Sequence, residues 1–335
     1  MNFSIIIPSY NNYLYLENCL KSIFKNLKKI KSKYEIIIVD DCSDKYDILK
    51  YKNIFQHNKI KIIKNKKNLG PAYCRNIGAK NSKYEILIFF DSDIECNPYT
   101  IRFMLKKIKK YDVINGIYDL EPLNDGIFPK YKSYLDYSLV YSKKDYPHVV
   151  FSSSCAAINK KIFLSVGGFN NNIKWGDDYE NEDLGCRLIN KNIKIYNCPK
   201  IKIKHNFKTF PSIFKFYYLR TKNWMLFHMK NKNKFKLSGV TRINNGLGCL
   251  SILIAIFIIP LIKINNLFVI LLVFALLYHF ITFRNFYFIT FKKNFFLMPL
   301  FILIHFFNSV LISIASINGF IKYFVHNSEL LKFKF

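Results

Sequence analysis

The second half of this sequence almost lacks acidic residues, since no Asp or Glu occurs between Asp183 and Glu329. In the whole chain, Lys and Arg outnumber Asp and Glu by 51 to 22. Such a positive excess attracts nucleic acid, but it attracts anionic lipid headgroups and phosphorylated substrates equally well. The sequence offers no base-reading element, so charge alone does not indicate a nucleic-acid-binding protein, and we expect no nucleic acid partner.

Paired cysteine spacings are also missing. The eight cysteines are scattered along the chain, without the short repeated intervals that zinc sites and disulfide frameworks require. The chain reaches Pro8 before any apolar run of signal-peptide length, so we expect no cleaved secretory signal. Both absences favour reduced thiols and a cytoplasmic location for the globular part.

Uncharged segments fill much of the C-terminal third. Three windows follow Arg242: Ile243–Ile262, Ile264–Phe283 and Asn294–Ile321. Each reaches the length of about 20 residues that crosses a bilayer as a helix, so we expect two or three membrane helices. The third window is longer and contains Pro299, and a re-entrant or interfacial segment is its alternative. The preceding segment Phe210–Met229 mixes aromatic and basic residues, as does a helix lying among lipid headgroups.

The most informative stretch is Glu85–Asp93, in which an apolar strand pattern ends in Asp91 and Asp93. In an open α/β sheet, ligands bind beyond the carboxyl ends of the strands. Two carboxylates with one residue between them can hold a divalent cation at such a place. An ordinary turn also explains a lone Asp-x-Asp pattern, because turns are rich in Asp.

Three neighbouring segments decide between these alternatives. Two further apolar strands end in polar loops, and a turn containing Asn and Gly opens a short helix. These segments are Ser4–Asn12, Ile36–Asp44 and Asn68–Lys80. Together and in this order, the four segments resemble family 2 glycosyltransferases. The resemblance implies an α/β fold, a GT-A domain with a Rossmann-like mixed sheet, followed here by C-terminal transmembrane helices.

The resemblance implies a metal site. By analogy with the family, Asp93 binds Mg²⁺ or Mn²⁺ directly, and Asp91 contacts the ribose or metal-bound water. The segment Ile201–His205 alternates like a strand, and His205 lies about where some members of the family complete the metal site. Imidazole is a good ligand for Mn²⁺ and a less natural one for Mg²⁺. A histidine without a ligand is the alternative for His205.

The resemblance also implies a nucleotide site. The loop around Pro8 and Tyr10 is expected to lie against the base, with Asp40 as a hydrogen-bond acceptor for it. Asp41 is the less favoured acceptor, and either carboxylate could instead cap the next helix. Arg75 matches an arginine of the family that reaches the base or a phosphate, whereas a plain surface arginine is its alternative.

The second half of the globular region resembles the family's small-residue strand, its Gly-Gly-Phe turn and its acidic helix. These are Ser152–Ile158, Val166–Asn170 and Trp175–Leu188. One departure is clear: Asn181 stands where the family has the Asp that acts as general base, and an amide cannot accept a proton as a carboxylate does. We expect Asp183 to take this catalytic role, then Glu182, then Asp178.

Arg220 and Trp224 partly resemble the Arg-Trp element of membrane glycosyltransferases, in which the cation meets the diphosphate and the indole lines the acceptor site. Their spacing departs from that element, and anchoring at the membrane interface explains both residues equally well.

The expected organisation has four segments: 1–209 catalytic, 210–242 basic and interfacial, 243–325 transmembrane, and 326–335 a short basic tail. The predicted protein is a multi-pass membrane enzyme with a cytoplasmic catalytic domain. It moves a single sugar, with inversion and with help from a metal, from a nucleotide-sugar donor to a lipid-linked or membrane-proximal glycan acceptor. The alternatives are a processive polysaccharide synthase and a catalytically impaired nucleotide-binding membrane protein.

Overall fold

The computed structural model describes residues 1–44, 57–173, 176, 178–231 and 242–332, with side chains described up to residue 325. The expectations for Trp175, Asp177 and the basic run 232–241 lie outside the described residues. The chain forms two compact units. Unit 1 comprises Met1–Asp125, Tyr141–Trp175 and Tyr179–Asn206, and unit 2 comprises Gly126–Val140, Gly176–Asp178 and Phe207–Phe335.

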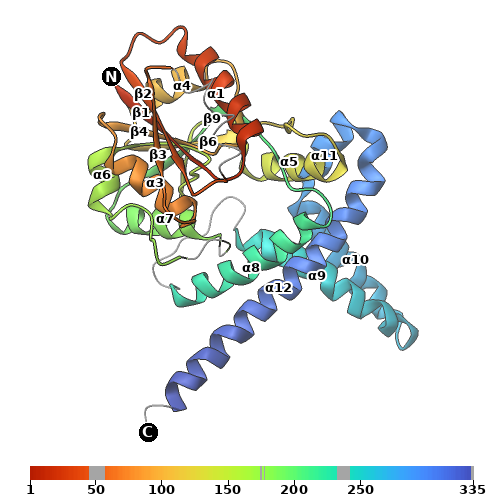
Figure 1. Ribbon diagram of the computed structural model, residues 1–335. Helices are drawn as coiled ribbons and strands as arrows, with labels where there is room; N and C mark the ends of the chain where they lie inside the picture. Colours follow the sequence, from red (N-terminus) through yellow and green to blue (C-terminus); the bar gives the residue numbers. More distant parts are fainter. Residues whose placement is uncertain (45–56, 174–175, 177, 232–241, 333–335) are drawn as a thin grey trace. The chain divides into compact units, whose positions relative to one another are not determined.

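The strands that the structure describes form one mixed sheet in unit 1 (Figure 1). They are β1 Phe3–Ser9, β2 Tyr34–Asp40, β3 Ile60–Lys64, β4 Ile86–Phe90, β5 Ile94–Cys96, β6 Val113–Tyr118, β7 Tyr146–His148, β8 Cys155–Asn159 and β9 Ile195–His205. Their order is β3-β2-β1-β4-β8-β6-β9-β5, and β7 pairs with β9. The first four strands of this order are parallel, so the carboxyl ends of β1, β2 and β4 lie at the same edge.

The parallel strands at the centre of this sheet are apolar along almost their whole length. Every residue of β1 and of β4 is buried. Strands buried on both faces by helices have such continuous apolar runs rather than an alternating pattern. The sequence predicted these strands correctly for this reason.

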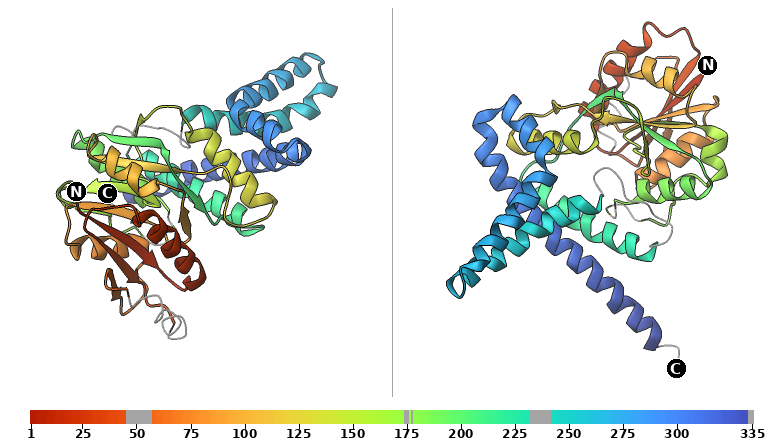
Figure 2. Two further views of the ribbon diagram at one scale, coloured as in Figure 1. Left: turned by 90° about the horizontal axis from the view of Figure 1, so that it is seen from above. Right: turned by 180° about the vertical axis from the view of Figure 1, so that it is seen from behind.

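Helices cover both faces of the sheet, as Figures 1 and 2 show. They are α1 Tyr13–Leu27, α3 Pro71–Lys80, α4 Thr100–Lys107, α6 Lys160–Ser165 and α7 Glu180–Asn190. On one face, Ile5 of β1 belongs to the same buried cluster as Leu20 of α1 and Met104 of α4. On the other face, Ile6 of β1 shares a cluster with residues of α3, α6 and α7, among them Leu184. Unit 1 is therefore a three-layer α/β/α structure.

Unit 2 is helical. Its elements are α5 Ile127–Val140, α8 Ser212–Lys230, α9 Ile243–Ile258, η2 Ile259–Lys263, α10 Leu267–Thr282, α11 Arg284–Lys293, η3 Phe295–Leu297 and α12 Met298–Lys332. Within it, α12 packs on α8 and α9, α9 packs on α10, and α5 packs on α11 (Figure 2). A Cβ atom at Gly319 of α12 would lie 2.5 Å from the carbonyl oxygen of Lys222, so glycine allows the close approach of α12 and α8.

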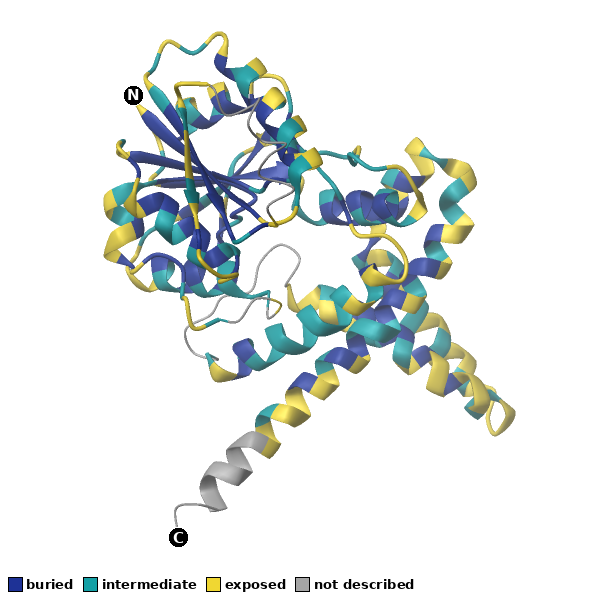
Figure 3. Cartoon of the chain, in the orientation of Figure 1, coloured by how far each residue is buried: buried dark blue, intermediate teal, exposed yellow. Residues whose placement is uncertain are grey.

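Two stretches among the described residues are long and apolar enough to cross a membrane, Ile243–Lys263 and Phe295–Val325. The pair α10 and α11, bent by 68°, raises the number to three if it forms one broken span. Large apolar side chains are exposed along α10, including Leu267 and Phe274, and Figure 3 shows most of this helix in yellow. The third apolar window of the sequence, for which a re-entrant segment was an alternative, lies largely in the single helix α12.

The interior of unit 2 holds a buried polar network. His279 of α10 lies between the carbonyl oxygen of Gly248, 2.9 Å from Nδ1, and the hydroxyl of Tyr287, 2.7 Å from Nε2. The hydroxyl of Tyr131 on α5 lies 2.8 Å from Nδ1 of His305 and accepts a hydrogen bond from Asn308. The two histidine rings are 5.1 Å apart. These contacts involve five helices, α5, α9, α10, α11 and α12, and are made through polar rather than apolar atoms.

Candidate active site

Three side chains at one end of the sheet form a cluster that could hold a metal ion. Asp91 follows β4, Asp93 precedes β5, and His205 ends β9. Strands β5 and β9 are antiparallel, and Ile94 pairs with His205, so the chain brings Asp93 next to the imidazole. Ligand atoms of the three residues lie within 4.8 Å of one another, and Nε2 of His205 is 3.5 Å from Oδ1 of Asp93.

The electrostatics of this cluster suit a cation. Burial raises the pKa of the Asp93 carboxyl; His205 opposes this rise, and the negative charge of Asp91 adds to it. The side chains keep 25% exposure at Asp91, 28% at Asp93 and 18% at His205, so substrate oxygens and water can reach an ion here. Two carboxylates and one imidazole are donors that bind Mn²⁺ well and Mg²⁺ acceptably. The residues therefore fit the divalent metal that the sequence predicted.

Arg75 connects this cluster to a second carboxylate. Its Nη2 donates to Oδ1 of Asp91 at 2.6 Å, and its Nη1 lies 3.8 Å from Oε1 of Glu180. The guanidinium also lies over the ring of Phe169, 5.4 Å from its centroid. Because only 4% of Arg75 is exposed, the plain surface arginine considered from the sequence is wrong, whereas its predicted contact with a nucleotide stays a prediction.

Two buried oxygen atoms lie where the nucleotide base is expected to bind. Ser9 and Asp40 are register partners at the ends of β1 and β2, and both are buried. Within the described part of the chain, neither Oγ of Ser9 nor Oδ2 of Asp40 has a hydrogen-bond partner, although Nζ of Lys64 lies 4.0 Å from Oδ2 of Asp40. A buried acceptor without a partner costs free energy unless a ligand supplies a donor. The arrangement suits a base with an N–H group. Pro8 is buried in β1, and Tyr10 beyond it is 44% exposed.

Asp41 has a different task from Asp40. Its carboxylate accepts hydrogen bonds from the backbone N–H groups of Leu69 and Gly70 and from the side chain of Asn65. It therefore fixes the turn that opens α3. The preference for Asp40 over Asp41 as the acceptor for the base stays a prediction.

The sequence analysis missed two asparagines that tie the loops of the site together. Asn11 accepts a hydrogen bond from the N–H of Asp44, and its own N–H donates to Ser43. Asn12 donates to the hydroxyl of Ser92, the residue between the two acids of the metal cluster. The signal was the pair of asparagines directly after β1, since short amides at strand ends often bond to neighbouring loops.

The acidic helix α7 is fixed closely in place. The N–H of Phe151 donates to the carbonyl of Asn181, and the N–H of Ser153 donates to its side-chain oxygen, both at 3.3 Å. A Cβ atom at Gly185 would lie 2.2 Å from the carbonyl oxygen of Val149. Asn181, which replaces the expected general base, is therefore a structural residue that holds α7 to the chain before β8.

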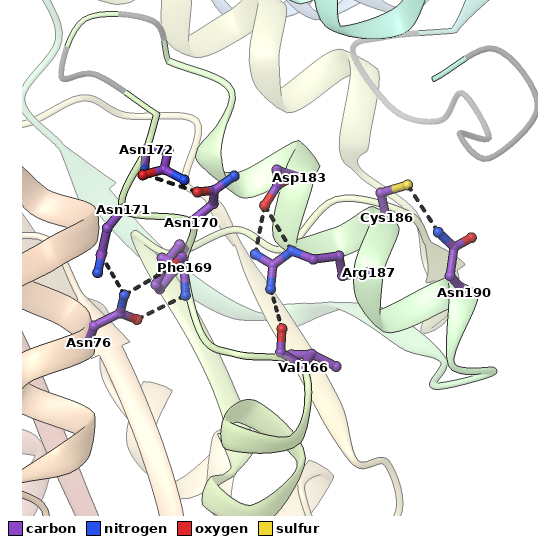
Figure 4. A network of polar contacts seen from close by, with 10 residues as sticks. All are labelled: Asn76, Val166, Phe169, Asn170, Asn171, Asn172, Asp183, Cys186, Arg187 and Asn190. Carbon is purple, nitrogen blue, oxygen red and sulfur yellow. Dashed lines mark hydrogen bonds and ion pairs between the residues drawn. The ribbon is translucent and has the colours of Figure 1, made fainter. Parts of the chain in front are cut away.

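The three carboxylates predicted as the base lie in different environments. Asp183 accepts two hydrogen bonds from Arg187, at 2.9 and 2.6 Å, and Arg187 also donates to the carbonyl of Val166 (Figure 4). Glu182 is only 2% exposed. Asp178, before the helix, has a left-handed backbone with φ of 55°. The predicted order of these candidates stays a prediction.

Arg220 and Trp224 lie on α8 in unit 2. The guanidinium of Arg220 is over the ring of Phe216, and the indole of Trp224 is stacked on the ring of His228 with an interplanar angle of 1°. Both contacts join residues one helical turn apart. They show an aromatic and cationic face on α8 but do not test the predicted contacts with diphosphate or acceptor.

Residues 4–167 match the model of the family described as Glycosyl transferase family 2. An uncharacterized glycosyltransferase of Haemophilus influenzae is 29% identical over 185 residues, 53% of this chain and 59% of the relative. The poly(ribitol-phosphate) beta-N-acetylglucosaminyltransferase TarS of Staphylococcus aureus is 33% identical over 106 residues, 30% of this chain and 18% of TarS. The chain thus spans less than two thirds of either relative.

The structure of the mannosyltransferase PcManGT from Pyrobaculum calidifontis, in complex with GDP-Man and Mn²⁺, has a similar fold. The TM-score is 0.58 at 11% identity, and the match covers 96% of this chain and 86% of PcManGT. At this identity the likeness concerns the fold alone, and it confirms the fold class predicted from the sequence. The match of residues 4–167 shows that this region belongs to glycosyltransferase family 2, and its fold is of the GT-A type.

Proposed function

We propose that this protein is a membrane-bound, inverting glycosyltransferase that moves a single sugar from a nucleotide-sugar donor to a lipid-linked or membrane-proximal glycan acceptor. One observation carries the proposal. The cluster of Asp91, Asp93 and His205 lies at the sheet edge where a buried oxygen of Asp40 accepts no hydrogen bond from the described residues. A metal site beside a base site is what binding of a nucleoside diphosphate requires.

The donor site follows from these groups. Asp40 accepts an N–H of the base, the backbone around Pro8 and Tyr10 lines the base, and Asp91 contacts the ribose or a metal-bound water. Arg75 keeps Asp91 in place and lies near the phosphates. The solved complex of PcManGT with GDP-Man and Mn²⁺ supports a nucleotide sugar as the class of donor.

Asp93, Asp91 and His205 would hold Mg²⁺ or Mn²⁺, and the imidazole favours Mn²⁺. When bound, the ion supplies positive charge to the leaving diphosphate. The chain's own residues orient the donor and remove the proton from the attacking hydroxyl of the acceptor. The carboxylates of the segment from Asp178 to Asp183 are the proposed source of this proton acceptor. Inversion is proposed from the resemblance to the family.

The helices of unit 2 support a reaction at a membrane. The two apolar stretches, with α10 and α11 as a third, are the proposed membrane anchor, and α8 is the proposed interfacial helix. Arg220 and Trp224 on α8 are proposed to meet the diphosphate and the acceptor. The proposed organisation keeps the segments 1–209, 210–242, 243–325 and 326–335, with the catalytic domain in the cytoplasm and membrane lipids as partners.

The proposal is tested with detergent-purified protein and a panel of UDP- and GDP-sugars, with a short polyprenyl phosphate as acceptor. Release of nucleoside diphosphate and the mass of the lipid product are measured with Mn²⁺, Mg²⁺ or EDTA. Asp93→Ala is the test variant, and Asp125→Ala, which alters an exposed carboxylate of the same unit, is the matched control.

We expect metal-dependent turnover of one donor that is lost in Asp93→Ala and kept in Asp125→Ala. The lipid should gain one sugar. Products with many added sugars would instead favour the processive synthase. Equal turnover by both variants would contradict the proposal.

A further inference from the structure

The carboxylates of α7 differ in whether their oxygens are free to accept a proton. Asp183 is bound by two N–H groups of Arg187, so protonating it would break a charge-assisted pair. Glu182 is buried at 2% exposure, out of reach of a large acceptor. Asn181 has an amide whose oxygen already accepts the N–H of Ser153. Both N–H groups of Arg187 bond to Oδ2 of Asp183, so Asp183 and Asn181 are already engaged with neighbours, whereas Glu182 is buried.

Glu180, the first residue of α7, lies in a different setting. Its side chain is 15% exposed, and its Oε1 is 3.8 Å from Nη1 of Arg75. This distance is too long for a hydrogen bond, so the attraction is electrostatic, and no hydrogen bond from another described residue occupies the lone pairs of the carboxylate. The sequence analysis did not include Glu180 among the site residues.

Arg75 places Glu180 beside the metal cluster. One guanidinium lies between the two carboxylates, 2.6 Å from Oδ1 of Asp91 and 3.8 Å from Oε1 of Glu180. It is buried and lies over the ring of Phe169, so it cannot move far without losing these contacts. Among the residues that the structure describes, Glu180 is thus the carboxylate of α7 that Arg75 connects to the metal cluster.

We propose that Glu180 is the general base of this enzyme and that Arg75 is a positioning residue which holds Glu180 next to Asp91. This inference rests on the proposed function. In the transfer, the acceptor oxygen forms a bond to the anomeric carbon, and the bond from that carbon to the diphosphate oxygen breaks. The leaving nucleoside diphosphate takes the electron pair, and the acceptor's hydroxyl proton moves to Glu180. The role of proton acceptor, which the amide of Asn181 cannot take, is therefore taken by the residue before it.

The test compares Glu180→Gln with Glu180→Asp, Glu182→Gln and Asp183→Asn, using the transfer assay in which the wild-type protein is active. Removal of a general base lowers the rate by about 10²- to 10⁴-fold. We expect Glu180→Gln to lower kcat by this factor while the donor KM changes less than about threefold. Glu180→Asp should restore part of the rate, because a shorter carboxylate can still accept the proton.

Two further measurements separate a catalytic from a structural effect. Binding of the nucleoside diphosphate with Mn²⁺, followed by calorimetry, should be the same for Glu180→Gln and the wild type. The unfolding temperature should fall more in Asp183→Asn than in Glu180→Gln, because only the former loses the pair with Arg187.

The inference is overturned if Glu180→Gln keeps its transfer rate within about threefold while Asp183→Asn or Glu182→Gln loses about 10² or more. It is also overturned if Glu180→Gln loses metal-dependent nucleotide binding together with its rate, because Glu180 would then serve the donor site. Failure of the proposed function is a different result, since the wild-type protein itself would transfer no sugar.

Discussion

In unit 1, apolar side chains fill the interior and polar ones collect at the ends of the strands. In unit 2, large apolar side chains lie on the outside, and the interior holds the buried polar network. Leu271 on α10 is 51% exposed, whereas His279 on the same helix is fully buried. The comparison teaches that the two units have opposite surfaces: unit 1 buries its apolar side chains, whereas unit 2 exposes apolar helices long enough to cross a membrane.

The polar groups of the two units also differ in purpose. In unit 1, Asp93 is partly exposed and an oxygen of Asp40 accepts no hydrogen bond from the described residues, so these two groups can bind ligands. Those of unit 2 are buried and hydrogen-bond with one another, as His279 does with Tyr287. Substitutions should therefore impair chemistry in unit 1 and assembly in unit 2, and four predictions test this contrast.

The largest effect is expected at the metal cluster. Asp93→Asn should lower the transfer rate by about 10³-fold, equivalent to about 4 kcal/mol, because the ion loses a charged ligand. The unfolding temperature of the metal-free protein should not fall, because burial raises the pKa of Asp93 and so disfavours its charged form in the folded state. Kinetics and thermal unfolding measure the two effects. A fall in stability with normal kinetics would reverse the contrast between the units.

The next effect concerns the outer surface of α10. Leu271→Asp should oppose membrane insertion by about 3 kcal/mol, because a carboxylate in the hydrocarbon core is costly. Leu164 on α6, which is 46% exposed, is the matched control, and Leu164→Asp should change stability by less than about 0.5 kcal/mol. The fraction of protein that stays in membranes after an alkaline wash is measured. Equal behaviour of the two variants would mean that α10 is not in contact with lipid.

A smaller effect is expected in the buried polar network. Tyr131→Phe removes the hydroxyl that His305 and Asn308 share, and buried polar groups without partners cost about 1–3 kcal/mol. The unfolding temperature in detergent should fall, while the KM for donor stays the same. Tyr278→Phe, at an exposed position of α10, is the control and should have little effect. Loss of donor binding without loss of stability would show that the network serves the active site.

The smallest effect is expected at Ser9. Its buried hydroxyl has no partner among the described residues, so Ser9→Ala should not destabilise unit 1. If the hydroxyl pairs with the nucleotide, the variant should bind nucleoside diphosphate about fivefold more weakly, a difference of about 1 kcal/mol. Calorimetry measures both the affinity and the unfolding temperature. Reduced stability with unchanged affinity would assign the hydroxyl to packing.

Much of the fold could be predicted from the sequence because its signals are local. The apolar runs of β1, β2 and β4 predicted buried strands, and the turn before Pro71 predicted the start of α3. The metal cluster joins Asp91 and Asp93 to a residue far along the chain, His205. It was expected only because the resemblance to the family supplied the long-range pairing that β5 and β9 then realise.

The other features of the site and of unit 2 depend on contacts between distant parts of the chain, which no local sequence pattern predicts. The contact of Arg75 with Glu180 requires α3 and α7 to cover the same face of the sheet, and these residues belong to separate motifs. The structural role of Asn181 depends on the chain before β8. The pairing of Tyr131 with His305 joins positions 174 residues apart, and helix α5 belongs to unit 2 although it lies within the predicted segment 1–209.

The pairing of Tyr131 with His305 and Asn308 has a consequence for biosynthesis. All the described strands of unit 1 lie before residue 206, so the ribosome completes this sheet before it begins α8. Domains generally fold as units during synthesis, N-terminal ones first. Tyr131 is translated early, but its partners are on the last helix. The interior of unit 2 can therefore close only after α12 has been made, and until then the hydroxyl of Tyr131 needs other hydrogen-bond partners, such as water.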